Sequence, residues 1–220
     1  MDVLTPLWLT LKVAGWATLL AGGAGIGLGW WMSRHRFAGQ GVLDAVLMLP
    51  MVLPPTVLGY YLIVLIGRNG VLGRYLDRWF GIHLIFTWQG AVIAAAIVAL
   101  PLVYKAARAG FEDVDARFAA AARTLGAGEF EVFLRVSLPL ASRGVAAGLM
   151  LAFARAMGEF GATLMIAGNL PGKTQTLSIA VYDAVQAGDD ARALWLTFLI
   201  SVLCVLVLVL SGRLLQARPR

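Results

Sequence analysis

The chain has 220 residues, of which 60% are apolar and only 14% are charged, with a formal net charge of +6. A soluble domain usually carries about half apolar and a quarter charged residues, so this composition excludes an ordinary soluble domain and indicates a polytopic membrane protein. The length suits one domain, residues 1–220, containing about five or six spanning helices of roughly 20 residues each.

Five apolar stretches are long enough to cross a membrane. In the first, the pairs Gly23/Gly27 and Gly25/Gly29 have a spacing that favours close packing of another helix. The fifth contains the only cysteine, Cys204, which we interpret as an apolar packing residue. The predicted fold class is therefore an all-α transmembrane bundle with spans near residues 10–32, 43–66, 86–104, 145–167 and 193–212.

Three prolines interrupt the second stretch. Pro50, Pro54 and Pro55 are predicted to break this span, and broken helices at membrane depth are tolerated only inside protein or beside a water-filled cavity. Lining of a translocation pathway by Pro54, Pro55 and Thr56, and a simple packing kink, are both open explanations.

The basic residues are unevenly distributed between the two predicted sides of the membrane. Eleven of the 18 lysines and arginines fall on the side of the 105–143 connection and five fall on the other, while Lys12 and Arg155 lie within spans. Because cytoplasmic loops are enriched in these residues, the N-terminus is predicted outside and the C-terminus in the cytoplasm. The net charge follows from this topology, so no nucleic-acid partner is expected. Membrane lipid is expected to surround the chain.

The 105–143 connection is patterned and is the most informative part of the chain. One apolar helical face is predicted over 114–125, with Asp113 or Asp115 at its N-terminus and Gly126 at its end. A second short helix is predicted over 129–137, and Pro139 then starts the way back into the membrane. The predicted face could rest on the bilayer or insert into a groove on a partner. Its residues are Val114, Phe118, Ala121, Ala122 and Leu125.

The same loop carries a family resemblance. Ala121-Ala122-x3-Gly126-x9-Val136-x-Leu138-Pro139 resembles the E-A-A-x3-G-x9-I-x-L-P signature of permease subunits of binding-protein-dependent ABC importers. The signature glutamate falls at Ala120, so one charged contact with the ATPase is missing. The resemblance implies a loop, about 112–138, that couples the chain to its ATPase through Phe118, Ala120, Ala121, Ala122, Gly126, Val136, Leu138 and Pro139.

Three further runs resemble the molybdate permease subfamily. They are LPMVLPPTVLG at 49–59, GEFGAT at 158–163 and GNLPGKTQT at 168–176. The resemblance implies a type I importer fold, a homodimer, two ATPase subunits that bind ATP and magnesium, and an external oxyanion-binding protein. Molybdate is the favoured cargo, and sulfate, thiosulfate or tungstate is the alternative. Rivals from other classes are an ATPase-independent secondary transporter or channel, and a structural membrane subunit.

The stretch AGNLPGKT at 167–174 is close to the phosphate-binding pattern G-x-x-x-x-G-K-[ST]. A working phosphate loop follows a β-strand and opens a helix, whereas this stretch follows an apolar helix on the predicted outer side. We therefore interpret it as a tight external turn. Nothing in the sequence supports catalysis in this chain, and no cofactor or metal is expected to bind it. The LSIAVYDAVQ segment that follows is too short to span and is predicted as an interfacial helix.

Two charged residues lie within the fourth predicted span. Arg155 and Glu159 are four residues apart on one helical face. An arginine fork suits a tetrahedral oxyanion, but the pair could also neutralise itself and pack the bundle. Thr163, near the outer end of the same span, is a candidate gate residue.

Overall fold

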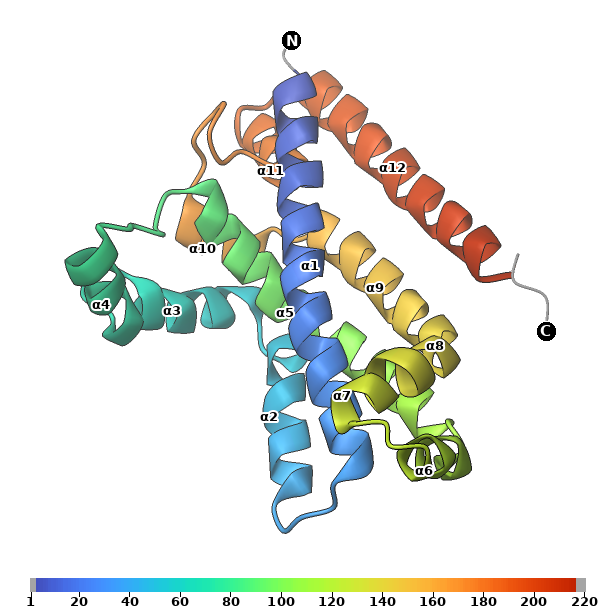
Figure 1. Ribbon diagram of the computed structural model, residues 1–220. Coiled ribbons are helices and arrows are strands. Elements are labelled where there is room, and N and C mark those ends of the chain that lie inside the picture. The colour runs from blue at the N-terminus through green and yellow to red at the C-terminus, as the bar shows by residue number, and fades with distance from the viewer. Residues whose placement is uncertain (1–2, 217–220) are drawn as a thin grey trace.

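The computed structural model describes residues 3–216, and within that range the chain forms helices, turns and no strand (Figure 1). The helices are α1 (Leu4–Arg34), α2 (Gln40–Val52), α3 (Pro55–Ile66), α4 (Val71–Phe80), α5 (Trp88–Glu112), α6 (Ala116–Thr124), α7 (Glu129–Val132), α8 (Leu138–Leu140), α9 (Ser142–Met157), α10 (Gly161–Ala167), α11 (Leu177–Gln186) and α12 (Asp190–Gln216), with a π-helix at Phe133–Ser137 between α7 and α8.

Helices α1 and α5 form the centre of the bundle, and small residues let them approach closely. A Cβ at Gly25 would lie 2.9 Å from the Cβ of Val103, and one at Gly29 would lie 2.9 Å from the backbone nitrogen of Arg108. A Cβ at Gly23 or at Gly27 would meet nothing within 4 Å. One predicted glycine pair therefore packs inside this chain, and the other faces away from it.

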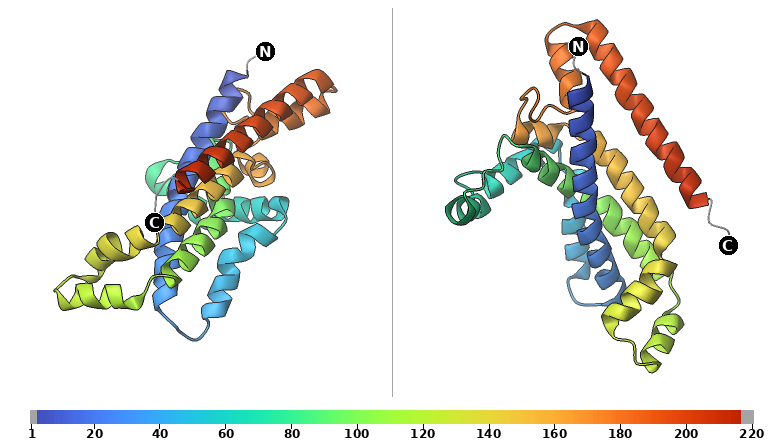
Figure 2. Two further views of the ribbon diagram at one scale, coloured as in Figure 1. Left: turned by 90° about the vertical axis from the view of Figure 1, so that its right-hand side faces the viewer. Right: turned by 45° about the horizontal axis from the view of Figure 1, so that its top comes forward.

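The bundle has two distinct ends. The N-terminal end holds the start of α1, helix α11 and the 168–176 turn, and the opposite end, called the loop end below, holds α6 to α8 (Figures 1 and 2). At the N-terminal end α11 is a short helix, as predicted. It does not lie free across the surface, because Leu177, Ile179, Ala180 and Ala184 are buried. This face packs against α12, and the Leu177 N–H donates to Thr10 Oγ1 at 2.8 Å.

The predicted proline break of the 43–66 stretch is confirmed at Pro54-Pro55 and is wrong for Pro50. Pro50 is accommodated inside α2, but the helix breaks at Leu53 and Pro54, and α3 leaves at 112° to α2. Proline lacks an N–H and restricts the residue before it, so the Pro54-Pro55 pair ends one helix and starts the next. With 13 residues, α2 extends only about 20 Å, less than the roughly 30 Å of a bilayer core.

The predicted continuous span at 145–167 is also interrupted. Helix α9 ends at Met157, and α10 begins at Gly161 after a break at 158–160. On its other side α9 meets the 129–140 helical segment at a bend of 77°. That segment runs through Pro139, so the chain turns at Ala141, two residues later than predicted. The π-helix just before Pro139 widens the turn where the proline ring and its missing N–H would disrupt an α-helix.

Three helices among the described residues are long and apolar enough to cross a membrane: α1, α5 and the Asp190–Leu210 part of α12. The number is five if each of the two bent pairs counts as one span. Helix α5 runs to Glu112, eight residues beyond the predicted end at 104, so the connection before α6 is only three residues long.

Candidate functional site

The 112–138 loop contains the helix, turn and helix that its pattern predicts. Asp115 caps α6 by accepting the Arg117 N–H at 2.9 Å, so of the two predicted caps it is Asp115 that serves. The Arg117 guanidinium holds the pKa of the Asp115 carboxyl below its usual value, which keeps the cap charged at neutral pH. Gly126 ends the helix at φ +87°, a conformation that a glycine adopts without strain.

The predicted apolar face of this loop is partly exposed in the single chain, because Leu125 is 88% and Phe118 56% exposed, whereas Val114 packs against the core cluster of Phe111. On the second short helix of the loop, Phe130 is 73% exposed. The buried side of α6 is Ala119 instead, a residue that the sequence pattern did not single out. Large apolar side chains that no part of this chain covers mark a surface for a partner or for lipid.

The residues of the importer signature divide between this surface and its support. Ala122, Gly126 and Val136 line one hollow of about 310 Å³ between α6 and the π-helix, together with Leu125. Leu138 packs inward against the core cluster that contains Phe111. The others, Ala120, Ala121 and Pro139, are exposed on the same segment. Some signature residues therefore line a surface hollow, and another packs into the core beneath it.

The loop contacts the end of α1 through residues whose pairing the sequence did not predict. Arg34 donates to Ser137 Oγ at 2.7 Å and lies 3.9 Å from a Glu129 carboxylate oxygen, which in turn pairs with Arg123. The Trp30 ring lies 5.0 Å from the Phe133 ring. The contacts of Arg34 and Trp30 join residues about a hundred positions apart in the chain, so no local pattern could reveal them.

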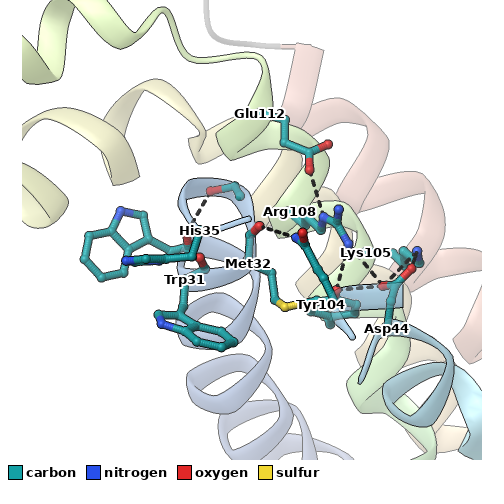
Figure 3. A network of polar contacts seen from close by, with 11 residues as sticks. Trp31, Met32, His35, Asp44, Tyr104, Lys105, Arg108 and Glu112 are labelled. Atoms are coloured by element: carbon teal, nitrogen blue, oxygen red, sulfur yellow. Dashed lines mark hydrogen bonds and ion pairs between the residues drawn. The ribbon is translucent and has the colours of Figure 1, made fainter. Parts of the chain in front are cut away.

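A second polar network at the loop end joins α2 to α5 (Figure 3). Asp44 accepts from Tyr104 Oη at 2.7 Å, from Lys105 Nζ at 2.8 Å and from Arg108 at 3.2 Å. Arg108 also donates to Glu112 at 2.8 Å. Between this network and the loop lies a hollow of about 970 Å³, lined by both charge signs. Ion pairs therefore stabilise the loop end on both sides of this polar hollow.

The two helix breaks meet. A Cβ at Gly161 would lie 2.6 Å from the Cβ of Pro55, and one at Gly59 would lie 2.7 Å from the Cβ of Met165, so α3 and α10 pack directly at their starts. Pro54, Pro55 and Thr56 are exposed in the single chain. The structure therefore brings the proline break of the second stretch beside the break that follows Glu159, which the sequence did not predict.

Glu159 is the charged residue at this junction. It is 3% exposed, pairs with Arg155 at 2.9 Å and accepts the Ala162 N–H at 3.0 Å. Its carboxylate therefore caps the restarted helix α10 while it neutralises the half-exposed arginine. Thr163 is buried, and its hydroxyl has no hydrogen-bond partner among the described residues.

The AGNLPGKT stretch is a closed turn. The N–H groups of Lys173, Thr174 and Gln175 all donate to the Leu170 carbonyl, at 2.9–3.2 Å. Its side chains are tied to α11, since Asn169 donates to Asp183 at 2.8 Å and Gln175 donates to Asn169 at 2.8 Å. Backbone donors that are already used inside the turn cannot form a phosphate cradle. Among the residues that the structure describes, no group of His, Cys, Asp and Glu is arranged to hold a metal ion.

An all-α membrane bundle with a surface loop of this kind and two meeting helix breaks defines a membrane-spanning transport subunit. Residues 25–219 match the model of the family described as binding-protein-dependent transport system inner membrane component. The chain belongs to this family and is a multi-pass protein of the inner membrane.

The similar proteins agree with this assignment. The molybdenum transport system permease protein ModB of Escherichia coli K12 is 44% identical over 216 residues, covering 96% of this chain and 94% of that protein. A putative molybdenum permease of Bacillus subtilis is also 44% identical, covering 94% and 89%. The sulfate permease CysT of Salmonella typhimurium is 35% identical, covering 96% and 75%.

Solved structures show the same fold. An inward-facing MetNI methionine ABC transporter chain has a TM-score of 0.72 at 16% identity, covering 98% of this chain and 95% of that one. A chain of a bacterial alginate ABC transporter has a TM-score of 0.73 at 15% identity, covering 96% and 77%.

Proposed function

We propose that this chain is the permease of an ABC importer that moves molybdate into the cell, with its N-terminal end outside and its loop end in the cytoplasm. The observation that carries the proposal is the 44% identity, over nearly the whole chain, to permeases named for molybdenum transport. The uneven distribution of lysine and arginine supports the orientation.

The exposed apolar face of the 112–138 loop is the docking surface for an ATPase subunit. Leu125 and Phe130 are knobs suited to a groove, and the hollow lined by Gly126 and Val136 can receive a side chain in return. The same loop also exposes the charged residues Arg117, Arg123 and Glu131, which suits a protein partner better than a bilayer. Two such chains form a homodimer on two ATPase subunits, which bind the ATP and magnesium.

The transport path runs along the meeting helix breaks at the two-fold axis. Arg155 and Glu159 neutralise one another, so this part of the path holds no strong net charge for a divalent anion. A path needs weak binding, because a deep site would trap the ion. Selection therefore belongs to an external binding protein, and ATP-driven closure of the ATPase pair switches the spans from inward-open to outward-open.

Sulfate is the second candidate cargo, because sulfate permeases are 35% identical to this chain. The test is uptake of labelled molybdate into proteoliposomes that contain this chain, its ATPase and its binding protein. We expect ATP-dependent molybdate uptake that a hundredfold excess of sulfate leaves unchanged. Equal uptake of sulfate would overturn the cargo, and uptake without ATP or the ATPase would overturn the importer class in favour of a secondary transporter.

A further inference from the structure

Two lysines at the N-terminal end share one hollow. Lys12 of α1 and Lys173 of the closed turn line a space of about 440 Å³ together with Trp8, Phe86, Trp88 and Gly172. The Nζ atom of Lys12 lies 3.6 Å from the centre of the Trp88 ring. Neither lysine has an ion pair among the residues that the structure describes. Transport as proposed above uses neither of them.

The aromatic residues of α1 place this hollow at the edge of the membrane. Trp8 is 65% exposed near one end of the helix, and Trp31 is 38% exposed near the other. They are 23 positions apart, which corresponds to about 35 Å of helix, close to the separation of the two aromatic belts of a bilayer. Lys12 lies one turn, about 6 Å, further in than Trp8. Its flexible side chain can therefore extend outward to the headgroup level.

A cation without a carboxylate partner at this depth is costly, and such residues usually have a partner that compensates the charge. A second cation, Lys173, lines the same hollow, so an anion bound there would compensate both charges. The face of α1 that carries Trp8 and Lys12 continues along the helix at spacings of three and four residues. Along that side Gly15 and Gly23 have open space above them, and Leu19 between them is 67% exposed. This face offers a shallow apolar track that begins at Lys12.

We propose that the hollow binds the phosphate headgroup of an anionic phospholipid from the leaflet at the N-terminal end, with an acyl chain lying along the Gly15–Leu19–Gly23 face. The phosphate lies between Lys12 and Lys173, and Trp8 and Trp88 contact the glycerol region. The apolar track favours a lipid over a soluble oxyanion, because a small anion would leave it empty.

The test is native mass spectrometry of the assembled transporter, purified from membranes and titrated with phosphatidylglycerol or phosphatidylcholine. Each lysine near a lipid headgroup contributes about fivefold to binding of an anionic lipid. We expect phosphatidylglycerol to be preferred by roughly 25-fold. Lys12→Gln and Lys173→Gln should each lower that preference about fivefold, and Lys12→Arg should retain it. Arg74→Gln, which removes an exposed cation from α4, is the matched control and should leave it unchanged.

A photoactivatable phosphatidylglycerol gives a readout that needs no variant. Crosslinks to the wild-type transporter are expected on the peptides that contain Trp8–Lys12 and Lys173. An equal preference in the two glutamine variants and the wild type, or crosslinks confined to other helices, would overturn the proposal. Displacement of the lipid by inorganic phosphate or molybdate at equal concentration would also overturn it, because the hollow would then be a site for a soluble oxyanion.

Discussion

Gly126→Val tests whether the turn of the 112–138 loop sets the contact with an ATPase. The left-handed φ of +87° is strained for a β-branched residue, but a Cβ at this position meets nothing within 4 Å. Valine therefore destabilises the folded turn only through backbone strain, by about 1–3 kcal/mol. This corresponds to a loss of roughly 5- to 150-fold in the population of correctly folded turns, and the Ala127 N–H to Ala122 carbonyl bond of 3.1 Å is lost with them.

The assay is the amount of ATPase that co-purifies with the chain, together with ATP-driven molybdate uptake. Gly128→Val is the matched control, because Gly128 is also exposed, has open space around it and adopts extended dihedrals of −72° and 164°. Asparagine tolerates the left-handed region, so Gly126→Asn should retain most of the association. Equal association in the two valine variants would refute the reasoning. A loss with asparagine as large as with valine would mean that the partner, and not the backbone, excludes a side chain.

Three further sets of substitutions examine contacts elsewhere in the bundle. Glu159→Ala should lower the free energy of unfolding by about 1–3 kcal/mol, because it removes a buried acceptor that caps α10. It should also lower the melting temperature in detergent more than Glu159→Gln, which keeps an acceptor oxygen. Arg34→Ala and Ser137→Ala should each speed proteolysis of the loop. A double-mutant cycle should give a coupling free energy of about 1–3 kcal/mol between them. Strictly additive effects would contradict the 2.7 Å hydrogen bond. Gly29→Ala should destabilise the chain through its contact with α5, while Gly27→Ala should not; a loss of stability with Gly27→Ala in the assembled transporter would show that this face is packed there.

The sequence predicted best where the pattern is local. A cap at Asp113 or Asp115, the end of α6 at Gly126 and the all-α class follow from capping, periodicity and hydropathy, and the structure confirms them, with Asp115 as the cap. These features depend on residues within one or two turns of each other, so one sequence contains the whole signal. Close packing at Gly25 and Gly29 was also predicted, but its partner α5 was not, because Val103 and Arg108 lie far along the chain.

The break in the fourth span was not predicted, and neither was the angle of the predicted break in the second, for a reason that hydropathy cannot detect. The segments before and after each break are both apolar, so a sliding window joins them. The break at Leu53 and Pro54 was visible as a pair of prolines, but its angle of 112° depends on the contact of Gly161 with Pro55, which lie 106 positions apart. The break at 158–160 depends on a carboxylate that caps the next helix, and that carboxylate looked like one half of an ion pair.

Helix α9 connects the two regions to which the function is assigned. It begins at Ser142, directly after the bend that ends the loop segment, and ends at Met157, directly before the break at Glu159. Its 16 residues form a rod of about 24 Å, and it packs along α5 through glycines: a Cβ at Gly148 would lie 2.8 Å from the Ala106 Cβ. A helix seated by small residues can slide or tilt without repacking large side chains. We infer that motion of the docked loop reaches the helix breaks through α9, because α9 follows the loop segment directly at one end and meets the break at Glu159 at the other.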